Sequence, residues 1–262
     1  MRPLVHPRIV LLGYGNLGYH LADALLRAGL NLVQIYNRSG LVSPSPGKVS
    51  VTTETTGILP DAEIYLLCVR DEAIGLVAEQ LSHRVHPDAV VAHTSGAAPL
   101  EQLARYFPLC GVFWPVQSFS RQVPTDFSQV PICVAGTTTI AENALLQLGR
   151  SLSNRVYSID HEERPRLHLA AVMANNFTNA LYDLAARQLE QMDLPFDLLR
   201  PLILQTALKV QEAMPVAVQT GPAIRNDRST LLKHLALLEQ EPELRELYRL
   251  LSKHINPKLE QL

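Results

Sequence analysis

The sequence predicts an α/β domain with a parallel sheet over residues 1–158, followed by an all-helical domain over residues 159–262. Three observations carry this prediction. A glycine-rich turn, Gly13–Gly18, stands between an apolar run and a helical pattern near the start of the chain. Short β-branched runs then alternate with helical stretches as far as about residue 155. From His161 onwards the strand signals stop and long helical patterns follow, and the length of 262 residues suits two domains.

The predicted elements follow this order along the chain. Runs rich in β-branched residues predict strands at Arg8–Leu12, Leu32–Tyr36, Val49–Thr52, Ile64–Val69, Val90–His93, Leu109–Trp114, Ile132–Ala135 and Val156–Ser158. Helices between them are expected at Asn16–Ala28, Ala73–Leu81, Pro99–Tyr106 and Ile140–Leu152. The stretch Ser39–Ser50, rich in Pro, Gly and Ser, predicts a loop. The second domain is expected to contain helices at Glu163–Met192, Phe196–Ala213, Ser229–Gln240 and Glu243–Ile255.

The composition argues against several classes of function. The net charge of −2 gives no electrostatic reason to expect nucleic acid or an anionic membrane as a partner. No apolar run approaches the length that crosses a bilayer. The cysteines Cys68, Cys110 and Cys133 are far apart and fit reduced thiols, so we expect a cytoplasmic protein. No CxxC or HExxH spacing is present, so no metal site is expected.

The glycine-rich turn has the sequence context of a dinucleotide-binding turn. The apolar run IVLL precedes it and a helical pattern follows it, which is the strand–turn–helix arrangement of a Rossmann domain. Gly13 permits the tight turn, Gly15 lets the backbone approach a pyrophosphate, and Gly18 allows close packing of the helix on the sheet. The N-terminus of the helix offers N–H groups to the phosphates. The residues expected at the cofactor are Gly13, Tyr14, Gly15, Asn16, Leu17 and Gly18.

The end of the second strand favours NADP(H) over NAD(H) as the cofactor. NAD-binding domains usually carry Asp or Glu about twenty residues after the glycines, where it hydrogen-bonds the ribose 2′-hydroxyl. This sequence instead has Asn37, Arg38 and Ser39. The Arg38 guanidinium can make charge-assisted contacts with a 2′-phosphate, which an acidic residue would repel. The alternative is that Arg38 is a solvated loop charge.

The fourth strand also ends at the expected ligand-binding crevice, because ligands of open α/β sheets bind at the carboxyl ends of the strands. Val69 and Arg70 follow this strand and are expected beside the cofactor. Asp71 is expected to cap the helix that comes next.

The fifth strand runs into His93, Thr94, Ser95 and Gly96, which would lie where nicotinamide and substrate meet. His93 can exchange a proton near neutral pH, and the three residues after it are expected to contact the substrate. In the alternative interpretation, Thr94 and Ser95 cap a helix and His93 is a hydrogen-bonded core residue. The segment 113–120 holds the sole tryptophan and either forms a wall of the pocket or packs in the core.

The helical domain contains a stretch without charged residues, 167–182. At about 100° per residue, His168, Val172, Asn175 and Asn179 fall on one stripe with Asn176 at its edge. Uncharged amides and an imidazole suggest burial with hydrogen-bonding partners. The stripe either faces the nucleotide domain across a cleft or forms a polar network between helices.

Two cations downstream are candidates for binding an anionic group of the substrate. Lys209 lies in the predicted helix Phe196–Ala213, and Arg225 lies in the donor-rich loop 219–227. Asp227 either pairs with Arg225 or caps the helix that begins at Ser229.

Taken together, these segments resemble a known group. GYGNLG, NRS, HTSGA, WPVQSFS, HLAAVMANNFTN and QTGPAIRND resemble a bacterial family with a Rossmann-like domain and a helical domain of unknown function. That family is similar to pyrroline-5-carboxylate reductases, ketopantoate reductases and deazaflavin-dependent NADP oxidoreductases. The resemblance implies a 6-phosphogluconate-dehydrogenase-like helical domain, catalysis in the cleft between the domains, and a homodimer formed through the helices.

One position departs from the resemblance. Ketopantoate reductases carry a lysine four residues before the first of two asparagines that are themselves four apart. Asn175 and Asn179 match that pair, but the lysine position is Ala171. Another group must therefore donate the proton, and His168 is the first candidate and His93 the second.

Two functions follow from these observations. The first is an NADP-dependent oxidoreductase that transfers hydride to or from a small carbonyl or imine metabolite, expected to be anionic. In it His168 or His93 supplies the proton, while Asn175 and Asn176 orient the substrate. Lys209 or Arg225 neutralises the anion. The second is a non-catalytic NADP(H)-binding sensor or scaffold, which Ala171 in place of lysine supports.

Overall fold

A computed structural model describes residues 7–40 and 49–259, so most of the predicted loop Ser39–Ser50 lies outside the described residues. The chain divides into two compact units, Met1–Leu181 and Tyr182–Leu262. The division falls inside a helix, beyond the predicted boundary between residues 158 and 159. That boundary marks the change from strands to helices, and it stays a prediction.

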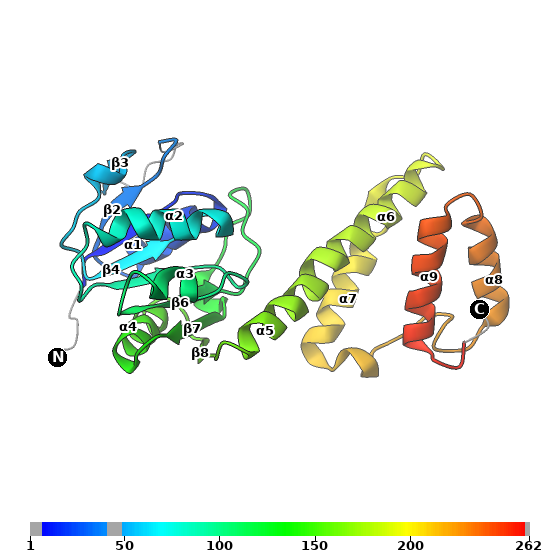
Figure 1. Cartoon of the computed structure of the whole chain (residues 1–262). Helices are drawn as coiled ribbons and strands as arrows, with labels where there is room; N and C mark the ends of the chain where they lie inside the picture. The colour runs from blue at the N-terminus through cyan, green and yellow to red at the C-terminus, as the bar shows by residue number, and fades with distance from the viewer. Residues whose placement is uncertain (1–6, 41–48, 260–262) are drawn as a thin grey trace. The chain divides into compact units, whose positions relative to one another are not determined.

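An eight-stranded sheet forms the centre of the first unit, in the order β3-β2-β1-β4-β5-β6-β7-β8 (Figure 1). The strands are β1 (Ile9–Leu12), β2 (Leu32–Tyr36), β3 (Ser50–Thr52), β4 (Ile64–Leu67), β5 (Val90–His93), β6 (Cys110–Pro115), β7 (Ile132–Gly136) and β8 (Val156–Ser158). Each predicted strand is present within two residues of its expected ends. The chain leaves β1 towards β2 on one side and returns to β4 on the other, which is the switch point where doubly wound sheets bind ligands.

The predicted parallel sheet needs one correction. Strands β1 to β6 pair in parallel, but β6 and β7 pair antiparallel, with Phe113 opposite Val134. A parallel return requires a crossover connection, usually a helix. The connection 116–131 contains only the short 3₁₀ helix η2 (Phe127–Gln129), so the chain reverses beside β6 instead.

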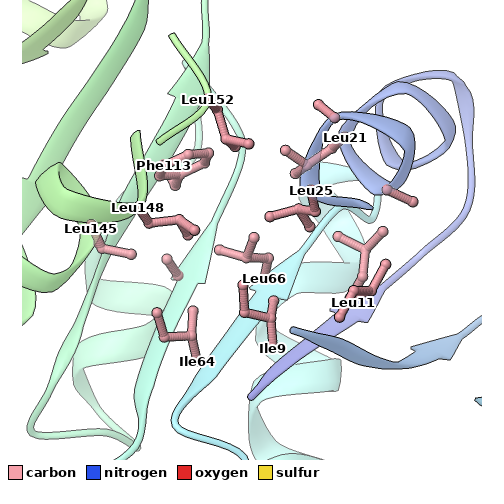
Figure 2. Packing of buried hydrophobic residues seen from close by; sticks show 14 of the residues in the cluster. Ile9, Leu11, Leu21, Leu25, Ile64, Leu66, Phe113, Leu145, Leu148 and Leu152 are labelled. Carbon is pink, nitrogen blue, oxygen red and sulfur yellow. The ribbon is translucent and has the colours of Figure 1, made fainter. Parts of the chain in front are cut away.

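Alternate residues of the central strands point to opposite faces of the sheet, and each face carries its own apolar core. On one face, Ile9 and Leu11 of β1 pack with Leu21 and Leu25 of α1 (Asn16–Arg27). Leu145 and Leu148 of α4 (Thr139–Arg150) and the other labelled side chains of Figure 2 complete this core. Burial of each such side chain contributes roughly 1.5–3 kcal/mol to folding.

The opposite face is covered by α2 (Asp71–Ser82) and α3 (Glu101–Ala104). Val10 and Leu12 of β1 are buried against it together with Ile74 and Leu81 of α2. Both faces are therefore closed by helices, as the apolar strands of a parallel sheet require.

The predicted helix Glu163–Met192 is present but irregular in its middle. It consists of α5 (Glu163–Ala171), the π-helical segment η3 (Val172–Phe177) and α6 (Thr178–Glu190). π-helical turns are rare and are frequently found at functional sites, so this irregularity marks a candidate functional segment.

The second unit holds the remaining helices, which agree with the predicted ranges within three residues except for one short helix at 215–217 that was not predicted. They are η4 (Phe196–Leu198), α7 (Arg200–Glu212), η5 (Pro215–Ala217), α8 (Arg228–Leu237) and α9 (Pro242–Ile255). A small core of Ala223, Leu231, Leu235 and Leu259 joins α8 to the chain around it. Within the described ranges, no helix is both long and apolar enough to span a membrane.

Candidate functional site

The glycines of the glycine-rich turn are of two kinds. A Cβ on Gly13 would collide with the carbonyl of Cys68, and a Cβ on Gly18 would collide with the carbonyl of Gly13. Gly13 also has a φ of +100°, which side chains rarely adopt. These two glycines are therefore required by the packing of β1, α1 and β4 at the switch point.

Gly15 is different, because the protein itself does not require a glycine there. A Cβ on Gly15 would meet nothing within 4 Å, and its φ of −72° suits any residue. No side chain caps the N-terminus of α1, where Gly15 is the N-cap. The bare backbone and the uncapped helix end leave room for a phosphate group from outside the protein, so the turn fits a bound dinucleotide.

The residues after β2 differ in their surroundings: one makes a structural contact with the glycine-rich turn, and the next two are exposed. The Asn37 side-chain oxygen accepts a hydrogen bond from the N–H of Tyr14 at 3.4 Å, which ties the end of β2 to the glycine-rich turn. Arg38 and Ser39 are exposed. Because it is exposed, Arg38 is accessible to a 2′-phosphate, and the predicted contact between them stays a prediction.

The carboxyl end of β4 lies against the turn, as predicted. Val69 would be 3.2 Å from a Cβ on Gly13, and Arg70 next to it is exposed. The prediction that Asp71 caps α2 is wrong, because Arg70 is the N-cap and no side chain accepts a capping bond. Asp71 instead occupies the first turn, where its carboxylate favours the positive end of the helix dipole.

His93, at the end of β5, has no exposed surface. Its Nδ1 accepts a hydrogen bond from the N–H of Ser95 at 3.2 Å, and its buried Nε2 has no partner among the described residues. Burial, together with the nearby Arg164, lowers the pKa of His93 from its usual 6.5 to about 3. The imidazole is therefore neutral at physiological pH.

The loop after His93 is held by its own side chains and by Arg164. Thr94 donates to the carbonyl of Leu67, and the Ser95 hydroxyl accepts from the N–H groups of Ala97 and Ala98. These bonds cap the turn 95–98 rather than a helix, because α3 begins only at Glu101. Arg164 of α5 is buried and donates to the carbonyls of Ser95 and Ala98, so it fastens this loop to α5.

A pocket of about 420 Å³ lies between α5–η3 and the end of β6, within the first unit. It is lined by Trp114, Val116, Gln117, Ser118, His168, Ala171, Val172, Ala174, Asn175 and Asn176. The predicted wall segment after β6 and the predicted polar stripe therefore meet at one pocket.

His168 is positioned in this pocket by two neighbours. Its ring packs edge-on against Trp114, with ring centroids 5.8 Å apart. A Cβ on Gly96 would lie 2.5 Å from the Trp114 ring and 2.9 Å from Nδ1 of His168. Only glycine at this position lets the backbone after β5 approach both rings.

The helical stripe needs two corrections. Asn175, Asn176 and Asn179 are exposed, so the expectation of burial is wrong for the chain as described. The π-helical bonds of η3 change the register that 100° per residue assumes. Asn175 and Asn176 line the pocket with His168 and Val172, as their places on the stripe predict, whereas Asn179 is not among the lining residues. Ala171, at the position of the relatives' lysine, does line it.

Lys209 and Arg225 belong to the second unit, where both are exposed. Their role towards an anionic substrate stays a prediction. Asp227 is the N-cap of α8, and its side chain accepts from the N–H of Thr230 at 3.1 Å. Of the two roles considered for Asp227, the cap is confirmed.

Arg121 is a contact of the turn that the sequence did not reveal. Its guanidinium donates to the carbonyl oxygen of Tyr14, 107 residues earlier in the chain. No local pattern in the sequence signals a contact over such a separation.

Comparisons with known proteins agree with this architecture. Residues 130–255 match the family model of a domain of unknown function, DUF2520. The putative NADP oxidoreductase of Bacteroides fragilis is 38% identical and has a TM-score of 0.86, with 96% of this chain and 98% of that chain covered. No curated protein matches the sequence.

Two more distant structures share the fold. A Thermotoga maritima protein has a TM-score of 0.74 at 22% identity, covering 95% of this chain and 97% of that one. The pyrroline carboxylate reductase of Plasmodium falciparum, with NADP bound, has a TM-score of 0.64 at 11% identity, covering 97% and 99%.

The Bacteroides fragilis protein combines 38% sequence identity with nearly complete coverage of both chains. The chain therefore belongs to the same Rossmann-like family as that protein, and its own residues 130–255 match DUF2520.

Proposed function

We propose that the chain is an NADP(H)-dependent oxidoreductase that transfers hydride to or from a small carbonyl or imine compound. One observation carries the proposal. The glycine-rich turn follows β1, the His93–Gly96 loop follows β5, and the His168 pocket adjoins the end of β6. Because β1, β4, β5 and β6 are parallel, all three features belong to the carboxyl edge of one sheet.

In this proposal the two predicted domains have different roles. Residues 1–158 bind the dinucleotide, and the helical residues from 159 onwards contribute the proton donor and the amides. The bound nicotinamide supplies or accepts the hydride. His168 donates a proton to the carbonyl oxygen or imine nitrogen during reduction, and takes it back in the reverse direction. Asn175 and Asn176 donate hydrogen bonds that orient the same atom.

The structure favours His168 over His93 for proton transfer. His93 has no exposed surface, and its lowered pKa leaves it without a proton to give as an imidazolium near neutral pH. His168 is partly exposed and lines the pocket. A proton donor must reach the reacting atom, so accessibility decides between them.

NADP(H) is the favoured cofactor because Arg38 stands, exposed, where an acidic residue would accompany NAD. The name of the Bacteroides fragilis relative supports the same cofactor. Binding is tested by titrating the chain with NADPH and NADH. We expect NADPH to bind more tightly, and equal affinities would contradict the assignment to Arg38.

Turnover is tested with NADPH and a panel of keto acids, neutral ketones and cyclic imines. Loss of absorbance at 340 nm with at least one class would support the oxidoreductase. A keto acid preferred over its amide would support the predicted anionic substrate held by Lys209 or Arg225. Tight NADPH binding without turnover on any class would favour the second candidate, a non-catalytic NADP(H) sensor, for which Ala171 in the pocket lining is the supporting observation.

The helices support the predicted homodimer. Leu169, Met173, Phe177 and Leu181 are spaced four apart and are between 40% and 56% exposed. Apolar side chains that repeat in this way along one exposed helix are suited to burial against another polypeptide, and a second copy of the chain would cover them. Phe177→Asp is expected to halve the mass measured by light scattering, whereas Leu76→Asp on α2 should not. A monomeric mass for the unaltered chain would contradict the dimer.

The three cysteines support a reducing compartment. All three are free thiols, and burial raises the pKa of Cys133 to about 11. We therefore propose the cytoplasm as the location of the protein.

A further inference from the structure

The segment that follows β6 contacts both parts of the proposed site. Val116, Gln117 and Ser118 line the His168 pocket. Only two residues later, the carbonyl of Ser120 is 2.9 Å from Nε2 of His20, a buried residue of α1. Arg121 then reaches the glycine-rich turn. One short stretch of chain therefore joins the pocket to the helix and turn proposed to bind the dinucleotide.

The Arg121 guanidinium is held in a notch between two tyrosines. Its central carbon is 5.4 Å from the ring centroid of Tyr14 and 5.4 Å from that of Tyr19. The two rings pack edge to face, with centroids 5.9 Å apart. Cation–π attraction from both rings restricts where the guanidinium can lie. From this position it donates to the Tyr14 carbonyl.

Both backbone polar groups of Tyr14 are therefore held by distant side chains. Its N–H donates to Asn37 at the end of β2, and its carbonyl accepts from Arg121 after β6. Tyr14 itself is almost fully buried. The peptide plane that follows Tyr14 is consequently anchored from outside the turn.

This anchoring has a consequence for the next residue. In a planar trans peptide, the carbonyl and the N–H point in opposite directions. The Tyr14 carbonyl points to Arg121, so the N–H of Gly15 points away from Arg121. Gly15 is the residue around which the protein leaves open space.

We propose that Arg121 is a positioning residue for dinucleotide binding, which acts by orienting the Tyr14–Gly15 peptide so that its N–H faces the cofactor pyrophosphate. The inference rests on the proposed function, because it requires a dinucleotide at this turn. A turn held in its binding conformation loses less entropy on binding, so the hydrogen bond contributes to affinity without touching the ligand. By reciprocal linkage, binding at the turn also affects the segment 116–121 and the pocket that it lines.

The test compares the dissociation constants of four chains: the unaltered chain, Arg121→Ala, Arg121→Lys and Arg27→Ala. Arg27 is the matched control, because it lines the same 720 Å³ cavity beside α1 as Arg121 but forms an ion pair with Asp23. The probes are NADPH, NADH and adenosine 2′-monophosphate, which has the 2′-phosphate but no pyrophosphate.

We expect Arg121→Ala to raise the dissociation constants of NADPH and NADH by the same factor, about tenfold, which corresponds to about 1.4 kcal/mol. Arg121→Lys should recover part of the loss, and Arg27→Ala should bind as the unaltered chain does. The affinity for adenosine 2′-monophosphate should not change. Loss of affinity for all three probes would overturn the positioning role, because it would show that Arg121 supports the fold as a whole rather than the glycine-rich turn.

The effect on the pocket has its own readout, because Trp114 is the single tryptophan of the chain and lines the pocket. Saturating NADP⁺ should change the Trp114 emission of the unaltered chain more than that of Arg121→Ala. Equal changes would overturn the link to the pocket. Unaltered affinity of Arg121→Ala for NADPH would overturn the positioning role alone, whereas failure of the unaltered chain to bind NADPH or NADH would overturn the proposed function as well.

Discussion

The glycine-rich turn and the His168 pocket lie at the same edge of the sheet but are built in opposite ways. The turn is defined by contacts among buried backbone groups, where Gly13 and Gly18 leave no room for a side chain. The pocket is open, and Asn175 and Asn176 on its helical wall are exposed and lie in a π-helical segment. The conformation of the turn is therefore fixed by packing within the protein, whereas the pocket is accessible from outside the protein.

The largest expected effect comes from a substitution in the His168 pocket that leaves the glycine-rich turn unchanged. His168→Ala should lower kcat by about 10²- to 10⁴-fold, because a positioned proton donor contributes about that much. The dissociation constant of NADPH should stay unchanged. His161→Ala serves as the matched control, since His161 is exposed and is not among the pocket residues. Undiminished turnover by His168→Ala, measured with any substrate found in the panel, would contradict the proposed role.

The next effect separates the two kinds of glycine within the turn. Gly18→Ala should destabilise the chain by about 2–3 kcal/mol, because its methyl group has no room beside the Gly13 carbonyl. Gly15→Ala should cost about 1 kcal/mol or less in stability. It should nevertheless raise the dissociation constant of NADPH at least about tenfold, because the methyl group takes up the space left for the pyrophosphate.

Urea denaturation and NADPH titration measure these two quantities on the same samples. Normal NADPH affinity in Gly15→Ala would show that the open space above Gly15 does not receive the cofactor.

The last effect, which is smallest near neutral pH, concerns His93, the last residue of β5. In the folded chain its pKa is about 3, against the usual 6.5 expected in the unfolded chain. Between these values the unfolded state binds the additional proton, so stability is complete above pH 6.5 and falls as the pH is lowered. The loss is at most about 1.4 kcal/mol per pH unit.

His93→Asn should therefore show a flatter dependence of stability on pH between pH 6.5 and 4.5 than the unaltered chain, when urea midpoints are compared. Equal slopes for the two chains would mean that His93 is not buried in its neutral form. His86→Asn is a suitable control, because His86 is exposed.

Local patterns were sufficient for the elements and for the turn. β-Branched runs and helical periodicity identify the strands and the regular helices because each pattern reflects burial against the two faces of one sheet. The turn is readable for a related reason. Tight turns and close packing of a helix on a strand require glycine, and three glycines at the right spacing after an apolar strand satisfy that requirement.

Features that depend on distant segments were not readable. The antiparallel return of β7 follows from a connection without a crossover helix, which a list of strands does not indicate. The stripe on α5–η3 was assigned with regular helical periodicity, which does not allow for the π-helical segment, and Asn179 is not among the pocket residues. Arg121 has no local signal, because its partner lies 107 residues away.

The sequence by itself determined the strand–turn–helix unit of Gly13–Gly18, the change from strands to helices, and the presence of Arg38 in place of an acidic residue. These are local properties, since each depends on neighbours along the chain. Only the tertiary structure decided that His168 and Trp114 meet over Gly96, that His93 is buried and neutral, and that Arg121 holds the turn. Those properties depend on burial and on contacts between distant segments, and neither exists before the chain folds.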